Sequence, residues 1–139
     1  MGARFWISGV VLFVVLMIGG FTIHGWLLHA DYAALPNLMR TEAESQGLFG
    51  WMIFANLLMG LGFTWIYRKG RESGRGWVGQ GLRFGVALAI TWSVPMYLIY
   101  YVVQPWPSSI VVKQIIFESV MGIVTGLVVA ALNRDPKPA

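Results

Sequence analysis

Residues 110–132 read IVVKQIIFESVMGIVTGLVVAAL, an apolar run that carries Lys113, Gln114 and Glu118 inside it. An α-helix rises 1.5 Å per residue, so about 20 apolar residues cross the hydrocarbon core of a bilayer. The run therefore predicts a transmembrane helix with Glu118 well inside the lipid layer. An ionised carboxylate at that depth costs about 2.5 to 3.5 kcal/mol on insertion scales. Glu118 should therefore face protein or water, or carry a proton.

Three further apolar runs, at about residues 5–28, 48–67 and 77–103, complete the predicted architecture. The 139 residues are 57% hydrophobic and 12% charged, whereas roughly 25% of the residues of a soluble domain are charged. This composition excludes a water-soluble globule. We expect an all-α fold, an integral membrane four-helix bundle that forms a single domain over residues 1–139 and keeps its first span uncleaved.

The charge distribution predicts how the helices are oriented. Basic residues gather at Arg4, in the loop RKGRESGR at residues 68–75, and in the tail with Arg134 and Lys137, whereas the other two loops hold only Arg40. Because loops rich in Lys and Arg stay in the cytoplasm, we expect both termini inside a bacterial cytoplasmic membrane. The net charge of +4 then reflects topology and lipid contacts and does not indicate nucleic acid.

Small residues predict where the helices pack. Gly81, Gly85, Ala89 and Ser93 recur every four residues, Gly122 and Gly126 form a GxxxG pair, and Gly60 shares a face with Asn56. Such ladders allow membrane helices to approach closely. They exceed what one small bundle needs, so we expect Gly81→Leu or Gly85→Leu to abolish association between chains. Pro95 leaves the carbonyl of Thr91 without its usual donor and predicts a kink near Trp92.

Polar residues at similar depth predict one polar layer across the four helices. His24, Asn56, Tyr97 and Glu118 all fall in the outer half of their spans. We interpret Glu118 as a hydrogen-bonded acid that joins helices, with Gln114 one turn away. A proton- or cation-binding role for Glu118 is the alternative.

Lys113 lies about 140° around the helix from Glu118 at 100° per residue, so an ion pair between them is not expected. We expect Lys113 to extend outward to the lipid headgroups, with an anionic ligand or a partner subunit as the alternative.

Cofactor and catalytic signals are sparse. The chain has no cysteine, which removes disulfides, thiolate metal sites and iron–sulfur ligation. His24 and His29 are five residues apart and do not share a helix face, so with Asp31 they do not predict a metal site. His24 alone could still be an axial ligand to a haem or a pigment. No nucleophile with an adjacent base is recognisable, so we expect no enzyme and no cofactor.

Three segments carry a resemblance to a known family: IHGWLLHADYAALPNLMRTEAE, QGLRFGVALAITWSVPMYLIYY and VVKQIIFESVMGIVTGLVVA. It resembles a family of small four-span bacterial inner-membrane proteins whose function is not characterised. The resemblance implies the four-span architecture, a Trp- and Pro-containing loop after the first span and one acid near the middle of the last span. It implies no catalytic residue.

Three functions follow from these patterns. The leading hypothesis is a non-enzymatic accessory or structural subunit, either in a homo-oligomer or in a larger respiratory or photosynthetic complex. Its partners would be the lipid bilayer and other membrane subunits, and a small-molecule ligand is compatible with it. The first alternative is a small proton-coupled transporter that uses Glu118. The second is a haem-, pigment- or quinone-binding membrane protein that uses His24.

Overall fold

The computed structural model describes residues 2–134, and within that range the chain is helical with no β-strand. The helices are α1 (Ala3–Gly20), η1 (Phe21–Leu27), α2 (His29–Ala33), α3 (Glu42–Gly47), α4 (Phe49–Gly70), α5 (Trp77–Leu88), η2 (Ala89–Ser93), α6 (Val94–Val103) and α7 (Ser108–Leu132), where η marks a π-helical segment. The all-α prediction is therefore confirmed.

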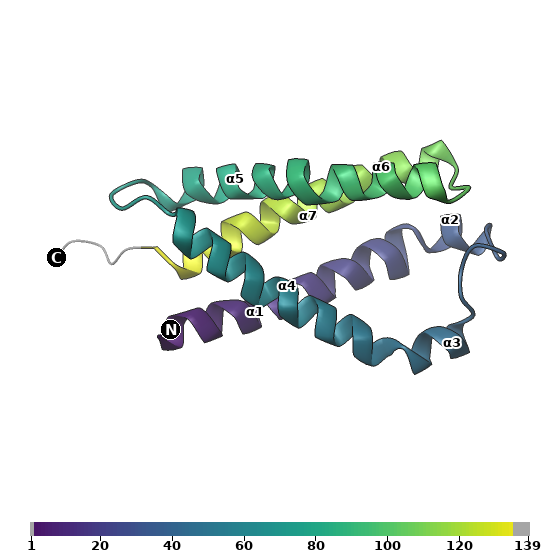
Figure 1. The fold of residues 1–139 in the computed structure, drawn as a ribbon, viewed down its shortest axis with the longest axis horizontal. Coiled ribbons are helices and arrows are strands. Elements are labelled where there is room, and N and C mark those ends of the chain that lie inside the picture. The colour runs from purple at the N-terminus through teal and green to yellow at the C-terminus, as the bar shows by residue number, and fades with distance from the viewer. Residues whose placement is uncertain (1, 135–139) are drawn as a thin grey trace.

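Four continuous helical segments are long and apolar enough to cross a membrane. They are Ala3–Leu27, Phe49–Gly70, Trp77–Val103 and Ser108–Leu132, with mean hydropathies between 1.5 and 2.3. Each boundary lies within about three residues of its predicted position, which is the scatter usual for helix ends. Figure 1 shows the four long segments running roughly along one direction.

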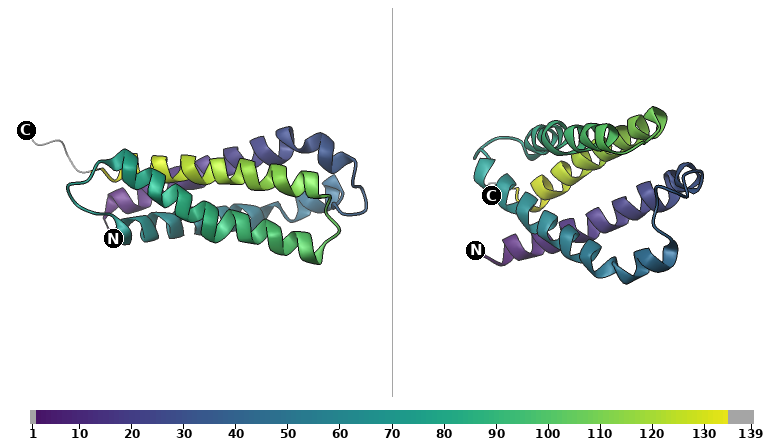
Figure 2. Two further views of the ribbon diagram at one scale, coloured as in Figure 1. Left: turned by 90° about the horizontal axis from the view of Figure 1, so that it is seen from above. Right: turned by 45° about the vertical axis from the view of Figure 1, so that its right-hand side comes forward.

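The four long segments pack in the order α4, α1, α7, α5–α6 (Figure 1). α4 lies mainly on α1, and α5 lies along α7, while α1 and α7 join the two pairs. We call the end that holds the N-terminus and the α4–α5 loop the closed end, and the end that holds α2, α3 and the α6–α7 turn the open end. Figure 1 and the right-hand view of Figure 2 show α4 moving away from α5 and α6 toward the open end. The bundle is therefore splayed at one end.

The apolar core lies toward the closed end. Leu12, Tyr67, Val129 and Ala130 form a buried cluster there, and the Tyr67 ring meets the Phe84 ring edge-on at 5.5 Å. These residues come from α1, α4, α5 and α7, so all four spans meet at this level. The closed end holds the helices together, and the splayed open end leaves room for polar side chains.

Glycines set the close approach of α5 to α7. A Cβ added to Gly85 would lie 2.6 Å from Ile123 Cα, and one added to Gly81 would lie 2.8 Å from the Gly126 carbonyl oxygen. Gly122 and Gly126 are buried in the same seam. Both predicted ladders therefore pack against each other inside one chain.

A glycine also allows α1 and α4 to approach each other closely. A Cβ on Gly60 would lie 2.6 Å from the carbonyl oxygen of Gly9. Together with the α5–α7 seam, this contact places the predicted packing glycines of spans 2, 3 and 4 inside the molecule. The surplus of glycine that suggested association between chains has an intramolecular use.

Two π-helical segments interrupt the long helices. η2 lies two residues before Pro95, where the missing proline N–H was expected to disturb the helix. The disturbance takes the form of a widened turn. η1 carries His24 near the open end of the first span. Such turns are rare and occur frequently at functional sites because they redirect side chains.

A capping box formed by Thr41 and Glu44 begins α3. The Glu44 backbone N–H donates to Thr41 Oγ1, and the Thr41 N–H donates to Glu44 Oε2 at 2.9 Å. The hydrogen bonds that the Thr41 backbone N–H and hydroxyl donate to the Glu44 carboxylate hold the pKa of Glu44 below its ordinary value. A depressed pKa contributes stability above the unfolded-state pKa, and this contribution is lost as the pH falls through the folded-state pKa.

Thr41→Ala should therefore lower the local stability of α3 by about 1 kcal/mol, because it removes the side-chain acceptor at the helix start. Hydrogen exchange of the α3 amides measures this effect. Ser45→Ala, inside the same helix, is the matched control and should leave exchange nearly unchanged. The wild-type protection should weaken in acid, and protection that does not depend on pH would contradict the assigned role of Glu44.

Candidate functional site

A chain of hydrogen bonds joins three helical elements near the open end. His24 on η1 uses both ring nitrogens: Nδ1 lies 2.7 Å from Tyr32 Oη, and Nε2 lies 3.0 Å from Glu118 Oε1. Gln114 Nε2 donates to the same Tyr32 hydroxyl at 3.0 Å. The π-turn of η1 carries the imidazole, while Gln114 and Glu118 are one turn apart on α7. We call these four residues the polar cluster.

The polar cluster has two consistent proton arrangements. With a neutral His24, the Tyr32 hydroxyl accepts from Gln114 and donates to Nδ1, and the Nε2–H donates to an ionised Glu118. With a protonated His24, both ring nitrogens donate, so the Tyr32 hydrogen must point elsewhere. One added proton therefore reorients Tyr32 and cancels the charge of Glu118.

Tyr32 stays a neutral hydrogen-bonding group. Burial raises the pKa of its hydroxyl, the hydrogen bond from Gln114 opposes the rise, and the nearby Glu118 and Asp31 carboxylates add to it. A raised pKa keeps the proton on the hydroxyl at neutral pH, where an unperturbed tyrosine is already protonated. Tyr32 can therefore donate to His24 in the neutral form of the cluster.

An ion pair lies beside the polar cluster. Lys113 Nζ contacts the two carboxylate oxygens of Asp31 at 2.8 and 2.9 Å. Asp31 belongs to α2 and Lys113 to the first turns of α7, so the pair ties the short helix after the first span to the last span. The two charges neutralise each other. Lys113 thus has a protein partner at the position where the sequence suggested lipid headgroups, an anionic ligand or a subunit.

A cavity of about 330 Å³ opens against the polar cluster. Its lining is largely aromatic and is shared by η1, α2, α6, α7 and the loops at the open end. The lining residues are His24, Tyr32, Met39, Tyr97, Tyr100, Gln104, Trp106 and Gln114. The volume falls at the lower end of the range for small-molecule sites, which are mostly apolar with a few polar groups that orient the ligand.

The structure brings together most, but not all, of the predicted site residues. His24, Gln114 and Glu118 are hydrogen-bonded through one cluster, and Tyr97 lines the adjoining cavity. Asn56 does not join them, because its amide donates to the Met52 carbonyl of its own helix, α4. The polar layer predicted across all four spans therefore involves only three of them, because α4 leaves the bundle toward the open end.

Some side chains of the candidate site were not predicted from the sequence, and one predicted residue has a different partner. Gln114 was expected to pair with Glu118 on its own helix, and it donates to Tyr32 instead. Tyr32, Tyr100 and Trp106 were not predicted as site residues, because their sequence neighbours give no sign that the two open-end loops meet. The opposite charges of Asp31 and Lys113, both near the outer ends of spans, were the one available signal.

Two further positions bear on metal and haem binding. His29 is exposed on α2. Within residues 2–134, no three His, Asp or Glu side chains lie together as a metal site requires. His24 has both nitrogens engaged, so an axial haem or pigment ligand would first have to break its bond to Tyr32 or to Glu118.

Tyr32→Phe should destabilise the open end by about 1 to 3 kcal/mol, because Gln114 and His24 both lose a partner in a half-buried site. Thermal unfolding in detergent measures the loss. Tyr101→Phe is the matched control, since Tyr101 is 46% exposed and should tolerate the change. Equal stability of the two variants would mean that the Tyr32 hydroxyl does not hold the cluster together.

Comparison of the chain with protein-family models, with curated proteins and with solved structures gives no match. The class of the protein therefore rests on its fold. It is an all-helical bundle with four helices long and apolar enough to span a membrane.

Proposed function

We propose that the chain is a multi-pass protein of a bacterial cytoplasmic membrane, with both termini in the cytoplasm. The four apolar segments support insertion. The orientation follows from the arginines and lysines, which gather at the closed end, while the open end has Arg40 and the paired Lys113. Because basic loops remain cytoplasmic, the closed end faces the cytoplasm and the polar cluster lies in the outer half of the membrane.

The absence of cysteine from the sequence makes this topology simple to test. Asn37→Cys in the open-end loop should react with a membrane-impermeant maleimide in intact spheroplasts. Ser73→Cys in the closed-end loop should react only after the membrane is permeabilised. The reverse pattern would invert the assigned orientation, and labelling of both sites in intact cells would contradict insertion as four spans.

We further propose that the polar cluster exchanges a small organic cation for a proton, as a proton-coupled transporter does. One observation carries this proposal: the carboxylate of Glu118, the single acid within the four apolar segments, contacts His24 at the wall of an aromatic-lined cavity. Aromatic faces attract cations, most strongly where water is excluded. The cavity therefore offers a cation aromatic side chains and a nearby negative charge.

Charge balance links the cation to the proton. Asp31 and Lys113 cancel each other, so the ionised Glu118 beside a neutral His24 leaves the cluster with one negative charge. A bound cation is stabilised by that charge, and a proton on the His24–Glu118 pair removes it. Cation and proton thus compete for one site, and the competition is the coupling that exchange requires.

Calorimetric titration of the purified protein in mild detergent tests the proposal. Tetraphenylphosphonium, an aromatic cation, should bind, and its affinity should fall as the pH is lowered, because proton and cation compete for the same negative charge. Tetraphenylborate, which has nearly the same shape and the opposite charge, is the matched control and should not bind at the site. Equal binding of the two ions would show only partition into the micelle and would overturn the proposal.

A second candidate function is the accessory or structural subunit, and α4 favours it. The half of α4 toward the open end exposes Trp51, Phe54 and Leu58 at 71%, 52% and 54%, and α4 lies mainly on α1. Another membrane subunit or a second copy could cover this face. The native mass in mild detergent tests this: a larger assembly supports the accessory role, and a monomer that binds the cation contradicts it.

A third candidate is a pigment-, haem- or quinone-binding protein that uses His24. Its support is the aromatic cavity beside the imidazole. A visible absorption band in the purified protein that disappears in His24→Ala would establish it, and a colourless protein would remove the haem and pigment versions. A quinone would bind without the charge preference that distinguishes the two tetraphenyl ions.

A further inference from the structure

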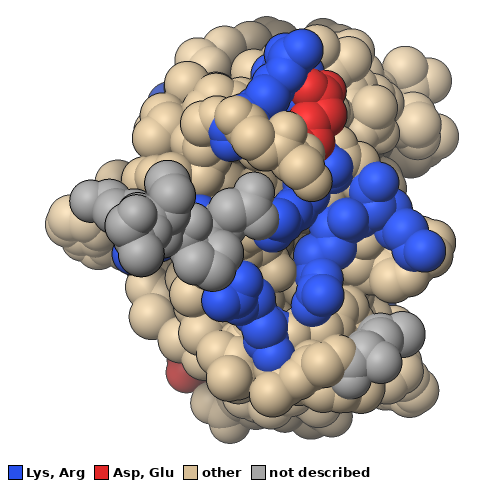
Figure 3. All heavy atoms as spheres, turned by 90° about the vertical axis from the view of Figure 1, so that its left-hand side faces the viewer, with Lys and Arg blue, Asp and Glu red and all other residues tan. Residues whose placement is uncertain are grey.

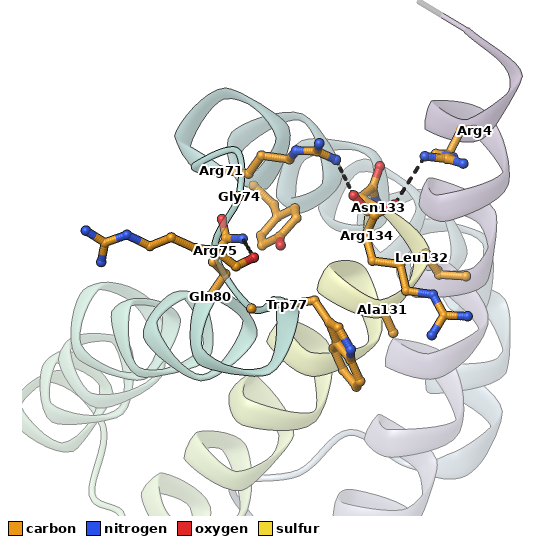
Figure 4. Close-up of a pocket in the computed structure, with 12 residues that line it drawn as sticks. Arg4, Arg71, Gly74, Arg75, Trp77, Gln80, Ala131, Leu132, Asn133 and Arg134 are labelled. Carbon is orange, nitrogen blue, oxygen red and sulfur yellow. Dashed lines mark hydrogen bonds between the residues drawn. The ribbon is translucent and has the colours of Figure 1, made fainter. Parts of the chain in front are cut away.

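A second pocket, of about 700 Å³, opens at the closed end, far from the polar cluster. It lies where the α4–α5 loop meets the C-terminal end of α7 and the first turn of α1, as Figure 4 shows. Four arginines from these segments line it: Arg4, Arg71, Arg75 and Arg134. Neither the cation site nor the helix-packing seams use this pocket.

The pocket is strongly positive. The described part of its lining has no carboxylate, and Glu72 is the one acid that residues 2–134 place at the closed end. Glu72 pairs with Arg75 at 2.6 Å and with Arg83 at 3.1 Å. Figure 3 shows the resulting surface, with basic side chains spread over the closed end and little acidic surface among them. An anion entering the pocket therefore meets an excess of guanidinium groups.

Hydrogen bonds hold the segments that carry the arginines in place. Arg71 donates to the Asn133 carbonyl and Arg4 donates to the Arg134 carbonyl at 3.4 Å, so both guanidinium groups reach the end of α7. The buried Asn133 side chain donates to Ser8 Oγ on α1 at 3.0 Å. The dashed lines in Figure 4 mark the two arginine contacts across the pocket. The positive groups are thus brought together before any ligand binds.

The α4–α5 loop is also fixed. Gln80, which is 8% exposed, accepts from the Glu72 backbone N–H at 2.7 Å and donates to the Arg75 carbonyl at 3.0 Å. A glycine-rich loop would otherwise leave Arg75 with many positions. Its backbone is instead tied to the start of α5, which keeps the loop arginines beside the pocket.

One wall of the pocket is apolar. Trp77 begins α5, and Leu132 ends α7, and both side chains line the space below the arginines. The pocket lining thus combines four arginines with apolar residues that belong to two long apolar segments. A small inorganic anion would not use that wall, whereas a phosphate attached to a hydrocarbon chain would use both parts.

We propose that this pocket binds the phosphate group of an anionic phospholipid from the cytoplasmic leaflet, with the glycerol and the first acyl carbons along Trp77 and Leu132. The inference rests on the proposed membrane insertion and orientation, and it is independent of the cation site. Arginine suits phosphate because its planar guanidinium donates two parallel hydrogen bonds to the phosphate oxygens. Basic pockets between spans on the cytoplasmic side are the usual sites for anionic headgroups.

Native mass spectrometry of the delipidated protein in detergent tests the site, with short-chain phosphatidylglycerol and short-chain phosphatidylcholine as paired probes. The wild-type chain should retain phosphatidylglycerol at least about tenfold more tightly, because a charge-assisted hydrogen-bond pair contributes roughly this factor. The double variant R75Q/R134Q should lose the preference. R40Q/R83Q removes the same number of charges outside the pocket and should keep it. Both double variants keep the hydrogen bonds that Arg4 and Arg71 donate to the carbonyl groups after the end of α7.

Three outcomes would overturn the assignment to a lipid. The two lipids could bind equally, or R40Q/R83Q could lose the preference as fully as R75Q/R134Q, which would indicate a diffuse surface charge. Alternatively, inorganic phosphate could displace the lipid at equal concentration, which would assign the pocket to a soluble phosphate compound. The two proposals can fail separately. If the protein fails the maleimide topology test but keeps the headgroup preference, the insertion proposal is wrong and the lipid site stands.

Discussion

Gly85→Leu should unfold the α5–α7 half of the molecule. The added side chain would begin 2.6 Å from Ile123 Cα and 2.8 Å from the Gly122 carbonyl oxygen, both backbone atoms of the facing helix. A backbone cannot move aside as a flexible side chain can, so the helices must separate. We expect a loss of more than about 3 kcal/mol, at the upper end of what overpacking costs. Thermal or SDS-induced unfolding in detergent measures the loss.

Gly79→Leu is the matched control, because Gly79 lies on the same helix and a Cβ there meets no other heavy atom within 4 Å. Its stability should stay close to that of the wild type. If Gly85→Leu instead left stability unchanged and abolished association between chains, the glycine seam would belong to an interface between copies, and the packing of α5 on α7 described above would be wrong.

Glu118→Gln should abolish cation binding and preserve the fold. Glutamine keeps a carbonyl oxygen that can accept from His24 Nε2, so the hydrogen-bonded chain survives without its negative charge. A charge about 6 Å from a bound cation contributes roughly 3 kcal/mol at an effective dielectric constant near 20. The affinity for tetraphenylphosphonium should therefore fall by roughly 100-fold.

The matched control is Glu42→Gln on α3, which removes the same charge from an exposed position at the open end. It should bind the cation as the wild type does. Circular dichroism and the unfolding midpoint show that both variants fold. Unchanged binding by a folded Glu118→Gln would remove Glu118 from the site, and equal weakening by Glu42→Gln would reduce the effect to general surface charge.

Local patterns predicted the elements of the fold well. Apolar runs are set by the length of a membrane-spanning helix, and Thr41 and Glu44 interact within four residues of sequence, so both can be identified without tertiary information. The spacing of Gly81 and Gly85 likewise indicated a close-packed face. It did not indicate which helix occupies that face, because any helix with small residues at a matching spacing, as Gly122 and Gly126 have, would fit.

Pairings between distant segments could not be predicted in the same way. Tyr32 meets His24 and Gln114 because the π-turn of η1 shifts the imidazole and because α2 folds back over the bundle. Neither event has a local sequence signal. Asn56 shows the converse, since its depth in the second span matched the cluster while the splay of α4 carried it away. The depth of a residue along its helix can be predicted from the sequence, whereas the neighbouring helix that its side chain faces cannot.

Arginines at the closed end illustrate the same limit. Their number in one loop predicted an orientation, but the pocket depends on Arg4 and Arg134, which come from the two ends of the described chain. The Asn133 contacts with Arg71 and Ser8 bring those ends together. A count of charged residues predicts that the surface of the closed end is positive. The packing of α1 against α7 determines that the arginines line a pocket.

The most direct test of the central claim is the number of protons released when the cation binds, measured in weakly buffered solutions over a range of pH. If cation and proton compete for the His24–Glu118 pair, the wild type should release up to about one proton per tetraphenylphosphonium bound, and Glu118→Gln should release none. Cation binding without proton release, or the same release from Glu118→Gln, would contradict the account.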